Sequence, residues 1–221
     1  MIQIEACLHA DADFRLRVLS LIGQMRALPS SQINRSEHFG IHSALAVIAL
    51  RAGDECAEHE LDQAQAIINN MEISISGAFE SYANLFEVAT ALAESPGIAS
   101  TAQHRNAQRV KNTCTILHKF ARTHYFARPR TLIFDGIQQW QRGAHGKALR
   151  SWEKAAALAG SYSMRYDIAR AHFEIGRHLA DGERWQKLGA DEHLHLAEAI
   201  FSEIDAGYML SRIEALYRSL K

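Results

Sequence analysis

The sequence predicts an all-α fold of stacked antiparallel helical hairpins, and three observations support this prediction. Apolar residues recur at helical spacing along the chain, and no segment sustains the alternation that is typical of a strand. The prolines Pro29, Pro96 and Pro129 all stand in breaks between these segments. Hydrophobic residues make up 48% of the 221 residues, which is enough to bury a core.

The helical spacing places the elements in order. Tyr82, Leu85 and Phe86 mark one face of a helix, as do Val110 and Leu117 further along the chain. The predicted helices span residues 11–27, 37–52, 57–71, 77–94, 100–124, 129–142, 145–160, 163–181, 189–205 and 207–220. They come in pairs joined by Gly-containing turns, which is the outline of stacked hairpins.

An internal comparison supports the stacking. The segment AEHELDQAQAII from Ala57 aligns without gaps on ADEHLHLAEAIF from Ala190, and GKALRSWEKAAALA is a weaker third copy. Each copy has a small residue, three residues between, and a large apolar residue. These pairs are Ala64 with Ile68, Ala148 with Trp152, and Ala197 with Phe201. We expect the small residue to let two helices approach closely and the large one to fill the space beside it.

These residues resemble the tetratricopeptide (TPR) repeat. Gly136, Ala148, Trp152 and Ala155 follow one another at the spacing of that family. The departures are Leu132 at the usual Trp, Asp135 at the usual Leu and Gln139 at the usual Tyr, together with a long inter-helix loop, DGERWQKLG. The resemblance implies a degenerate TPR-like superhelix.

Residues Arg128 to Ala206 are similar to the C-terminal helical tail of bacterial multidomain signalling ATPases. In those chains an adenylate or guanylate cyclase or a serine/threonine kinase domain precedes an AAA-type ATPase and the tail. The resemblance implies a free-standing or truncated repeat module whose partner is a signalling ATPase, cyclase or kinase. We divide the chain into an N-terminal helix and linker (1–35), hairpins with segregated charge (36–127) and TPR-like repeats (128–221).

Several short fragments suggest a catalytic or metal-binding site, but each lacks residues that such a site requires. The Gly146-Lys147 pair does not complete a phosphate-binding loop. Gln141 stands at the first Gly position of that motif, and Ala148 stands at its hydroxyl position. Ser151-x-x-Lys154 lacks the companion motifs of acylating enzymes. The pairs His38 with His42 and His193 with His195 have no third ligand at a diagnostic spacing. We therefore predict no catalytic residues, no metal and no cofactor, so the chain is predicted not to be an enzyme.

Charge is segregated along the chain. Residues 52–104 contain acidic side chains and no Lys or Arg, and residues 95–134 contain no acid. One interpretation is that neighbouring hairpins neutralise each other across their packed faces. The other is a basic strip that faces an acidic partner or RNA, formed by Arg105, Arg109, Lys111, Lys119, Arg122 and Arg128. The formal net charge of −1 favours protein over RNA as the partner.

The family's geometry suggests a peptide groove. In TPR arrays the first helix of each pair lines the concave face, which here places five candidates there: Arg130, Ile133, Ile137, Trp140 and Gln141. The alternative for Trp140 is packing against the next hairpin. We predict a cytoplasmic protein-interaction or regulatory module with a protein or peptide partner, no membrane association, and homo-oligomers left open. The alternative function is a helical RNA-binding or nucleotide-signalling accessory that uses the basic strip at 105–130.

Overall fold

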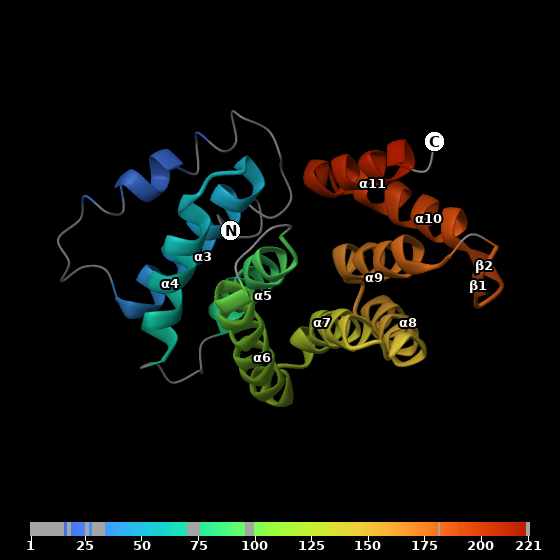
Figure 1. Ribbon diagram of the computed structural model, residues 1–221, viewed down its shortest axis with the longest axis horizontal. Helices are drawn as coiled ribbons and strands as arrows, with labels where there is room; N and C mark the ends of the chain where they lie inside the picture. Colours follow the sequence, from blue (N-terminus) through green and yellow to red (C-terminus); the bar gives the residue numbers. More distant parts are fainter. Residues whose placement is uncertain are drawn as a thin grey trace. The chain divides into compact units, whose positions relative to one another are not determined.

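The computed structural model describes residues 34–69, 76–95, 100–180 and 182–219, together with positions 16, 19–24 and 27. Helices make up almost all of these ranges, which confirms the predicted all-α class (Figure 1). The chain divides into two compact units, Met1–Phe120 and Ala121–Lys221. Most of the predicted first helix and of the segment 1–35 lies outside the described residues, although 19–24 are helical.

The first unit is built from consecutive helices that pack on one another. Its described elements are α3 (Arg35–Ala52), α4 (Cys56–Ile68), the short η1 (Ser76–Ala78), α5 (Phe79–Glu94) and α6 (Ser100–Thr123), whose last turn belongs to the second unit. Helix α3 packs against both α4 and α5. At the centre, the ring of Tyr82 lies 4.9 Å from that of Phe39 and 6.3 Å from that of Phe120. Of the cysteines in the described residues, Cys56 is exposed and Cys114 is buried.

Local sequence fixes the ends of α3. The side chain of Asn34 accepts a hydrogen bond from the amide of Glu37 at 3.0 Å, and the Glu37 carboxylate accepts one from the amide of Asn34 at 2.7 Å. This reciprocal capping satisfies two amides that the helix itself leaves unpaired. At the other end Gly53 has a φ of 67°, a left-handed conformation that glycine adopts without steric cost.

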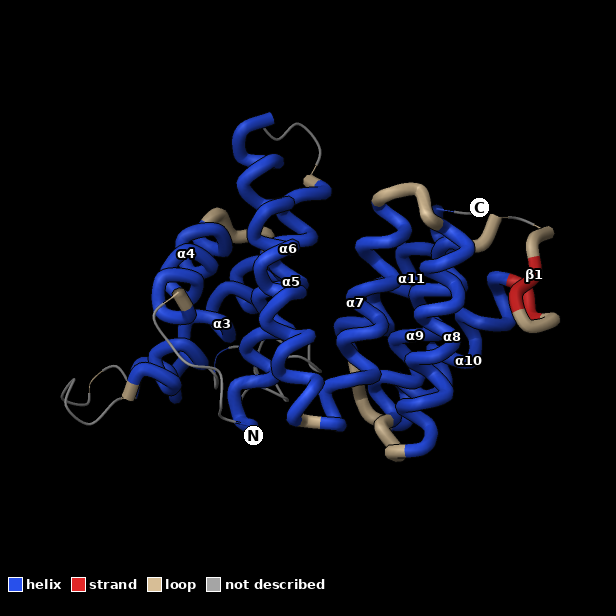
Figure 2. Tube along the Cα trace, turned by 90° about the horizontal axis from the view of Figure 1, so that it is seen from below, coloured by secondary structure: helices blue, strands red, loops and turns tan. Residues whose placement is uncertain are grey.

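The second unit is a row of helices in which each packs on the next (Figures 1 and 2). Its elements are η2 (Tyr125–Ala127), α7 (Arg128–Gln141), α8 (His145–Ser161), α9 (Arg165–His178), β1 (Arg184–Trp185), β2 (Leu188–Gly189), α10 (Ala190–Glu203) and α11 (Gly207–Ser219). Helix α9 also packs against α7. The α7–α8 and α9–α10 pairs therefore form neighbouring hairpins.

The small-then-large residue pairs lie in the core. Ala64, Ala148 and Ala197 are each fully buried, and so are their partners Trp152 and Phe201. Other matches in the internal alignment do not share this burial. Ala66 and Ala199 are exposed, so their agreement comes from helix composition and not from packing.

The long loop between α9 and α10 forms an element that the periodicity did not predict. Helix α9 ends at His178, and Arg184–Trp185 then pairs antiparallel with Leu188–Gly189. Gln186 and Lys187 form the two-residue turn between these strands, with φ values of 52° and 70°. Two positive φ values are typical of the turn that matches the twist of a tight hairpin. Among the described residues, no helix has both the length and the apolar character required to cross a bilayer.

Candidate binding site

The predicted groove residues on α7 are mostly interior. Ile133 and Ile137 are buried at 0% and 4% exposure, so they offer no surface to a partner and we remove them from the candidate groove. Arg130 is also buried, because its guanidinium forms an ion pair with Asp167 and lies 4.5 Å from the ring centroid of Tyr166. The physical reason is the packing of α9 against α7. Of the five candidates, Gln141 is exposed.

Trp140 is half-buried in a stack of rings. Its centroid lies 3.9 Å from that of His145, 4.4 Å from that of His178 and 5.8 Å from that of Trp152. His178 comes from α9, so Trp140 packs against the next hairpin, which was the alternative interpretation of this residue. Its ring thus contributes to the fold, and only its remaining exposed part is open to a partner.

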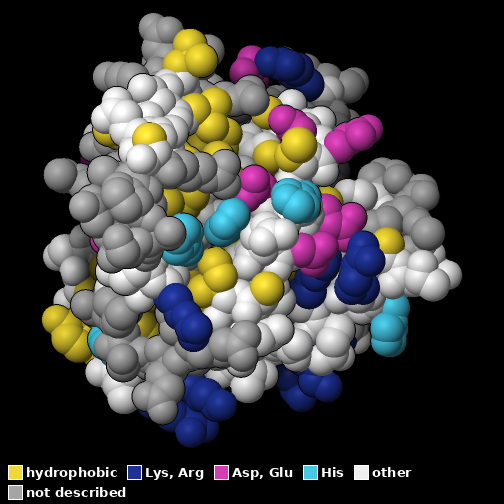
Figure 3. Space-filling view, turned by 90° about the vertical axis from the view of Figure 1, so that its left-hand side faces the viewer, with side chains coloured by type: hydrophobic (Ala, Val, Ile, Leu, Met, Phe, Trp, Pro, Cys, Tyr) yellow, Lys and Arg dark blue, Asp and Glu magenta, His cyan; other side chains and the backbone are white. Residues whose placement is uncertain are grey.

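Two residues of the basic strip form ion pairs inside the first unit. Arg105 pairs with Glu58, and the buried Arg109 pairs with Glu58 at 3.2 Å and with Asp62. Figure 3 shows acidic and basic side chains next to one another on this side of the molecule. These contacts join α4 to α6 and fit the interpretation that the two charge blocks neutralise each other.

The rest of the strip is exposed but divided. Lys111 and Lys119 form no ion pair with any described residue of the chain. Arg122 and Arg128 are exposed as well, but they belong to the second unit, and Arg128 donates to the carbonyl of Ala121 at 3.1 Å. The six residues therefore do not form one continuous strip within a unit.

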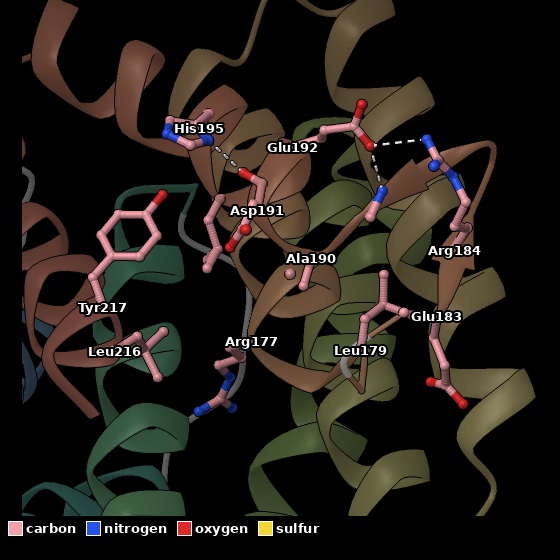
Figure 4. Close-up of a pocket in the computed structure, with 14 residues that line it drawn as sticks. Arg177, Leu179, Glu183, Arg184, Ala190, Asp191, Glu192, His195, Leu216 and Tyr217 are labelled. Carbon is pink, nitrogen blue, oxygen red and sulfur yellow. Dashed lines mark hydrogen bonds and ion pairs between the residues drawn. The ribbon is translucent and has the colours of Figure 1, made fainter. Parts of the chain in front are cut away.

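A cavity of about 890 Å³ lies in the second unit between the end of α9, the β1–β2 hairpin, the start of α10 and the end of α11 (Figure 4). Three glycines and one alanine, three leucines and one tyrosine, and six charged or imidazole side chains make up its lining. The lining residues are Gly176, Arg177, Leu179, Gly182, Glu183, Arg184, Gly189, Ala190, Asp191, Glu192, Leu194, His195, Leu216 and Tyr217.

Hydrogen bonds hold the hairpin wall of this cavity in place. The Arg184 side chain donates to the carbonyl of Lys187 at 2.7 Å and to the Glu192 carboxylate at 3.2 Å. The same carboxylate accepts from the amide of Gly189 at 2.6 Å. Arg184 and Glu192 therefore connect the hairpin turn to the first turn of α10, and both side chains are already engaged.

A contact between two histidines, the buried His193 and the half-buried His172, supports the β1–β2 hairpin. His193 Nε2 lies 3.2 Å from the carbonyl of Trp185, and its Nδ1 lies 2.9 Å from Nδ1 of His172. Because the carbonyl only accepts, we assign the Nε2 proton to His193, and His172 Nδ1 then donates to His193. Burial lowers the pKa of both rings, and the pKa of His172 reaches about 4 with a further contribution from His193.

The floor of the cavity is apolar and tightly packed. Leu194 is buried, and a Cβ on Gly176 would lie 2.8 Å from its Cγ. Glycine at 176 is therefore required for α9 and α10 to approach this closely. The floor continues through Leu179 and Leu216, which are half-buried.

Tyr217 stands at the α11 end of the cavity, opposite the hairpin. Its hydroxyl is directed toward His195 in Figure 4, and the two ring centroids are 5.8 Å apart. This hydroxyl is buried and has no hydrogen-bond partner among the described residues. Burial raises the pKa of Tyr217, and the carboxylates of Glu198 and Asp191 raise it further, so the phenol stays protonated at neutral pH.

The arrangement is suited to binding. Apolar side chains form the floor, and polar groups stand at the border, which is the usual composition of a ligand site. No group of three or more His, Cys, Asp or Glu side chains within the described ranges is placed to hold a metal ion.

Sequence reasoning missed Arg177, Leu216 and Tyr217 as site residues. The sequence feature that could have indicated a site is the long loop DGERWQKLG, which departs from the repeat pattern and supplies one wall of the cavity. The loop alone does not show which helix ends face it. That information comes from the packing of α9 and α11 against α10.

The chain matches no protein-family model, no curated protein and no solved structure.

Proposed function

We propose that the chain is a non-catalytic, TPR-like protein-interaction or regulatory module, and that its cavity binds an extended segment of a partner protein. The observation that carries this proposal is the cavity at the end of the α9–α10 hairpin. The cavity adjoins the β1–β2 segment, which two antiparallel helices do not need for their connection. Hydrogen bonds to α10 hold this segment in place.

The size and lining of the cavity favour a peptide. A volume of about 890 Å³ lies within the usual range of ligand sites and has room for a few side chains. An apolar floor inside a charged border is also the arrangement of protein interfaces, where burial contributes affinity and the border contributes specificity.

The resemblance of residues 128–206 to the tails of signalling ATPases supports a bacterial signalling system as the setting. In this proposal the module acts in the cytoplasm, and its partner is an ATPase, a cyclase or a kinase of that system. The segment that enters the cavity belongs to this partner.

The RNA alternative is supported less well by the charges. Arg105 and Arg109 are bound to Glu58 and Asp62, so two of the six basic residues are neutralised. Lys111 and Lys119, which are the two lysines of the strip, are exposed. An RNA-binding function requires affinity that falls steeply as salt is raised. A flat response to salt, or no binding at low salt, would remove this alternative.

Site-specific photocrosslinking tests the peptide proposal in cells. A photoreactive phenylalanine analogue replaces Asp191 or Glu183, which are exposed and line the cavity, and Lys147 or Arg150, which are exposed on α8 outside it. We expect the two cavity positions to capture the same partner peptide, identified by mass spectrometry, and the α8 positions not to capture it. Identical products from all four positions, or none from the cavity, would contradict the proposal.

A further inference from the structure

Arg177 borders the cavity with its guanidinium already fixed. Its Nε donates to the Glu174 carboxylate at 2.7 Å, and its guanidinium carbon lies 5.6 Å from the centroid of Phe173. These two contacts leave its terminal nitrogens without a partner among the described residues. A guanidinium that is held in place and has unused donors loses little conformational entropy when it binds an anion.

Arg177 shares its carboxylate partner with a second arginine. Glu174 is fully buried and also accepts a hydrogen bond from Arg170 at 3.0 Å, so one carboxylate serves two guanidinium groups. Arg212 lies over the same Phe173 ring at 4.8 Å. Burial would raise the pKa of Glu174, but the charges of Arg177, Arg170 and Arg212 overcome it and lower the pKa to about 2. Glu174 is thus ionised near neutral pH.

The other charged side chains around the cavity limit the negative charge that a bound ligand can carry. Arg184 already donates through Nε and Nη2 to Lys187 and Glu192, whereas neither terminal nitrogen of Arg177 has a partner among the described residues. Glu183, Asp191 and Glu192 also line the cavity and would repel a second negative charge. The apolar side chains of Leu179, Leu194 and Leu216 line the same space as Arg177.

We propose that Arg177 binds a single carboxylate of the ligand, and that the apolar group next to this carboxylate packs on the half-buried Leu179 and Leu216. The inference rests on the proposed function, because it concerns the same cavity. It names the chemistry of the partner segment, which is a carboxylate beside an aliphatic side chain. A guanidinium binds a carboxylate through two parallel N–H···O hydrogen bonds, which gives both strength and orientation.

A pair of small probes isolates the carboxylate. N-acetyl-leucine carries the acid, and N-acetyl-leucine amide has the same apolar group without the charge. Each is titrated into the ¹⁵N-labelled full chain, and the amide signals of Gly176, Gly182 and Gly189 report on the cavity lining. We expect the acid to shift these signals with an affinity about tenfold higher than the amide, because hydrogen bonds to charged groups are stronger.

Two variants assign the effect to one side chain. Arg177→Gln should reduce the affinity for the acid to that for the amide, whereas the control Arg150→Gln, at an exposed position on α8 outside the cavity, should leave the acid's advantage intact. The acid and amide titrations on the unaltered protein do not depend on the folding of any variant. Equal affinities for the two probes, no binding of either, or an unchanged preference in a folded Arg177→Gln protein would each overturn the inference.

The crosslinking experiment separates this inference from the proposed function. If the cavity captures a partner but shows no preference for the acid, Arg177 is not a carboxylate receptor and the peptide proposal stands. If the acid binds through Arg177 but no partner is captured, the site binds a free carboxylate and the proposed function fails.

Discussion

The indole of Trp152 occupies the position that a side chain on Gly136 would need. A Cβ at 136 would lie 2.2 Å from Nε1 of Trp152, and that nitrogen donates to the carbonyl of Ile133 at 3.0 Å. Helix α8 therefore lies against the bare backbone of α7 at this point. The contact explains in physical terms why a glycine and a tryptophan stand at these two positions.

Gly136→Ala should destabilise the second unit, because Trp152 must move and lose its hydrogen bond. We expect a loss of about 2–3 kcal/mol, measured by urea unfolding. The control Gly160→Ala makes the same change in α8, where nothing lies within 4 Å, and should stabilise the helix by up to about 1 kcal/mol. Tryptophan emission isolates the relevant unit, since Trp140, Trp152 and Trp185 are the chain's three tryptophans. Equal effects of the two changes would contradict this explanation.

Glu174→Gln should be far more harmful than the same change at an exposed ion pair. It leaves the buried Arg170 and the mostly buried Arg177 without their carboxylate, for which we expect a loss of about 3–5 kcal/mol. Glu203 pairs with Arg165 at the surface, where the side chains are 57% and 50% exposed. Glu203→Gln should cost less than about 1 kcal/mol in the same urea titration. A small effect at Glu174 would mean that its charge is not needed for folding.

Stability of the second unit should fall on acidification because of His172. The pKa of this residue is about 4 in the folded chain, below its ordinary 6.5, so the unfolded chain binds the proton first as the pH falls. The loss begins near pH 6.5, continues to pH 4 and amounts to about 3 kcal/mol. His172→Phe, which cannot titrate, should lose less stability between pH 7 and pH 4.5 when followed by tryptophan emission. Parallel pH curves for the two proteins would exclude His172 as the cause.

Tyr82→Phe should leave the first unit as stable as before or raise its unfolding free energy by about 1 kcal/mol. The Tyr82 hydroxyl is buried without a hydrogen-bond partner among the described residues, and burial raises its pKa to about 12. Removing an unsatisfied polar group recovers its desolvation penalty. Tyr125→Phe, at a residue that is 61% exposed, is the matched control and should change little. Thermal unfolding followed by circular dichroism measures both, and a clear loss at Tyr82 would reveal a hydrogen bond.

The sequence predicted the helices well because each has a long apolar face. The predicted range 145–160 became His145–Ser161, and 77–94 became Phe79–Glu94 after a short 3₁₀ turn. The pairing of a small residue with a large one also placed Ala148 and Trp152 in the core. A repeat of this kind carries information about burial, since only one face of a helix can be covered by its neighbours.

The candidate site could not be predicted in the same way. The strands at Arg184–Trp185 and Leu188–Gly189 have two residues each, too few to show any alternation. The importance of Arg177 depends on Glu174 being shared with Arg170, and spacing alone does not reveal which partner a side chain takes. Ile137 was assigned to an open face because family geometry was applied before the packing of α9 was known.

The tip of the β1–β2 hairpin reaches back to the preceding hairpin. Gln186 donates to the Glu153 carboxylate of α8 at 2.6 Å, and the Arg130–Asp167 ion pair joins α7 to α9. Stacked repeats often unfold one after another, because each touches only its neighbours. These two contacts between neighbouring repeats couple the folding of the two hairpins. We therefore expect the hairpins to unfold together in a single cooperative transition.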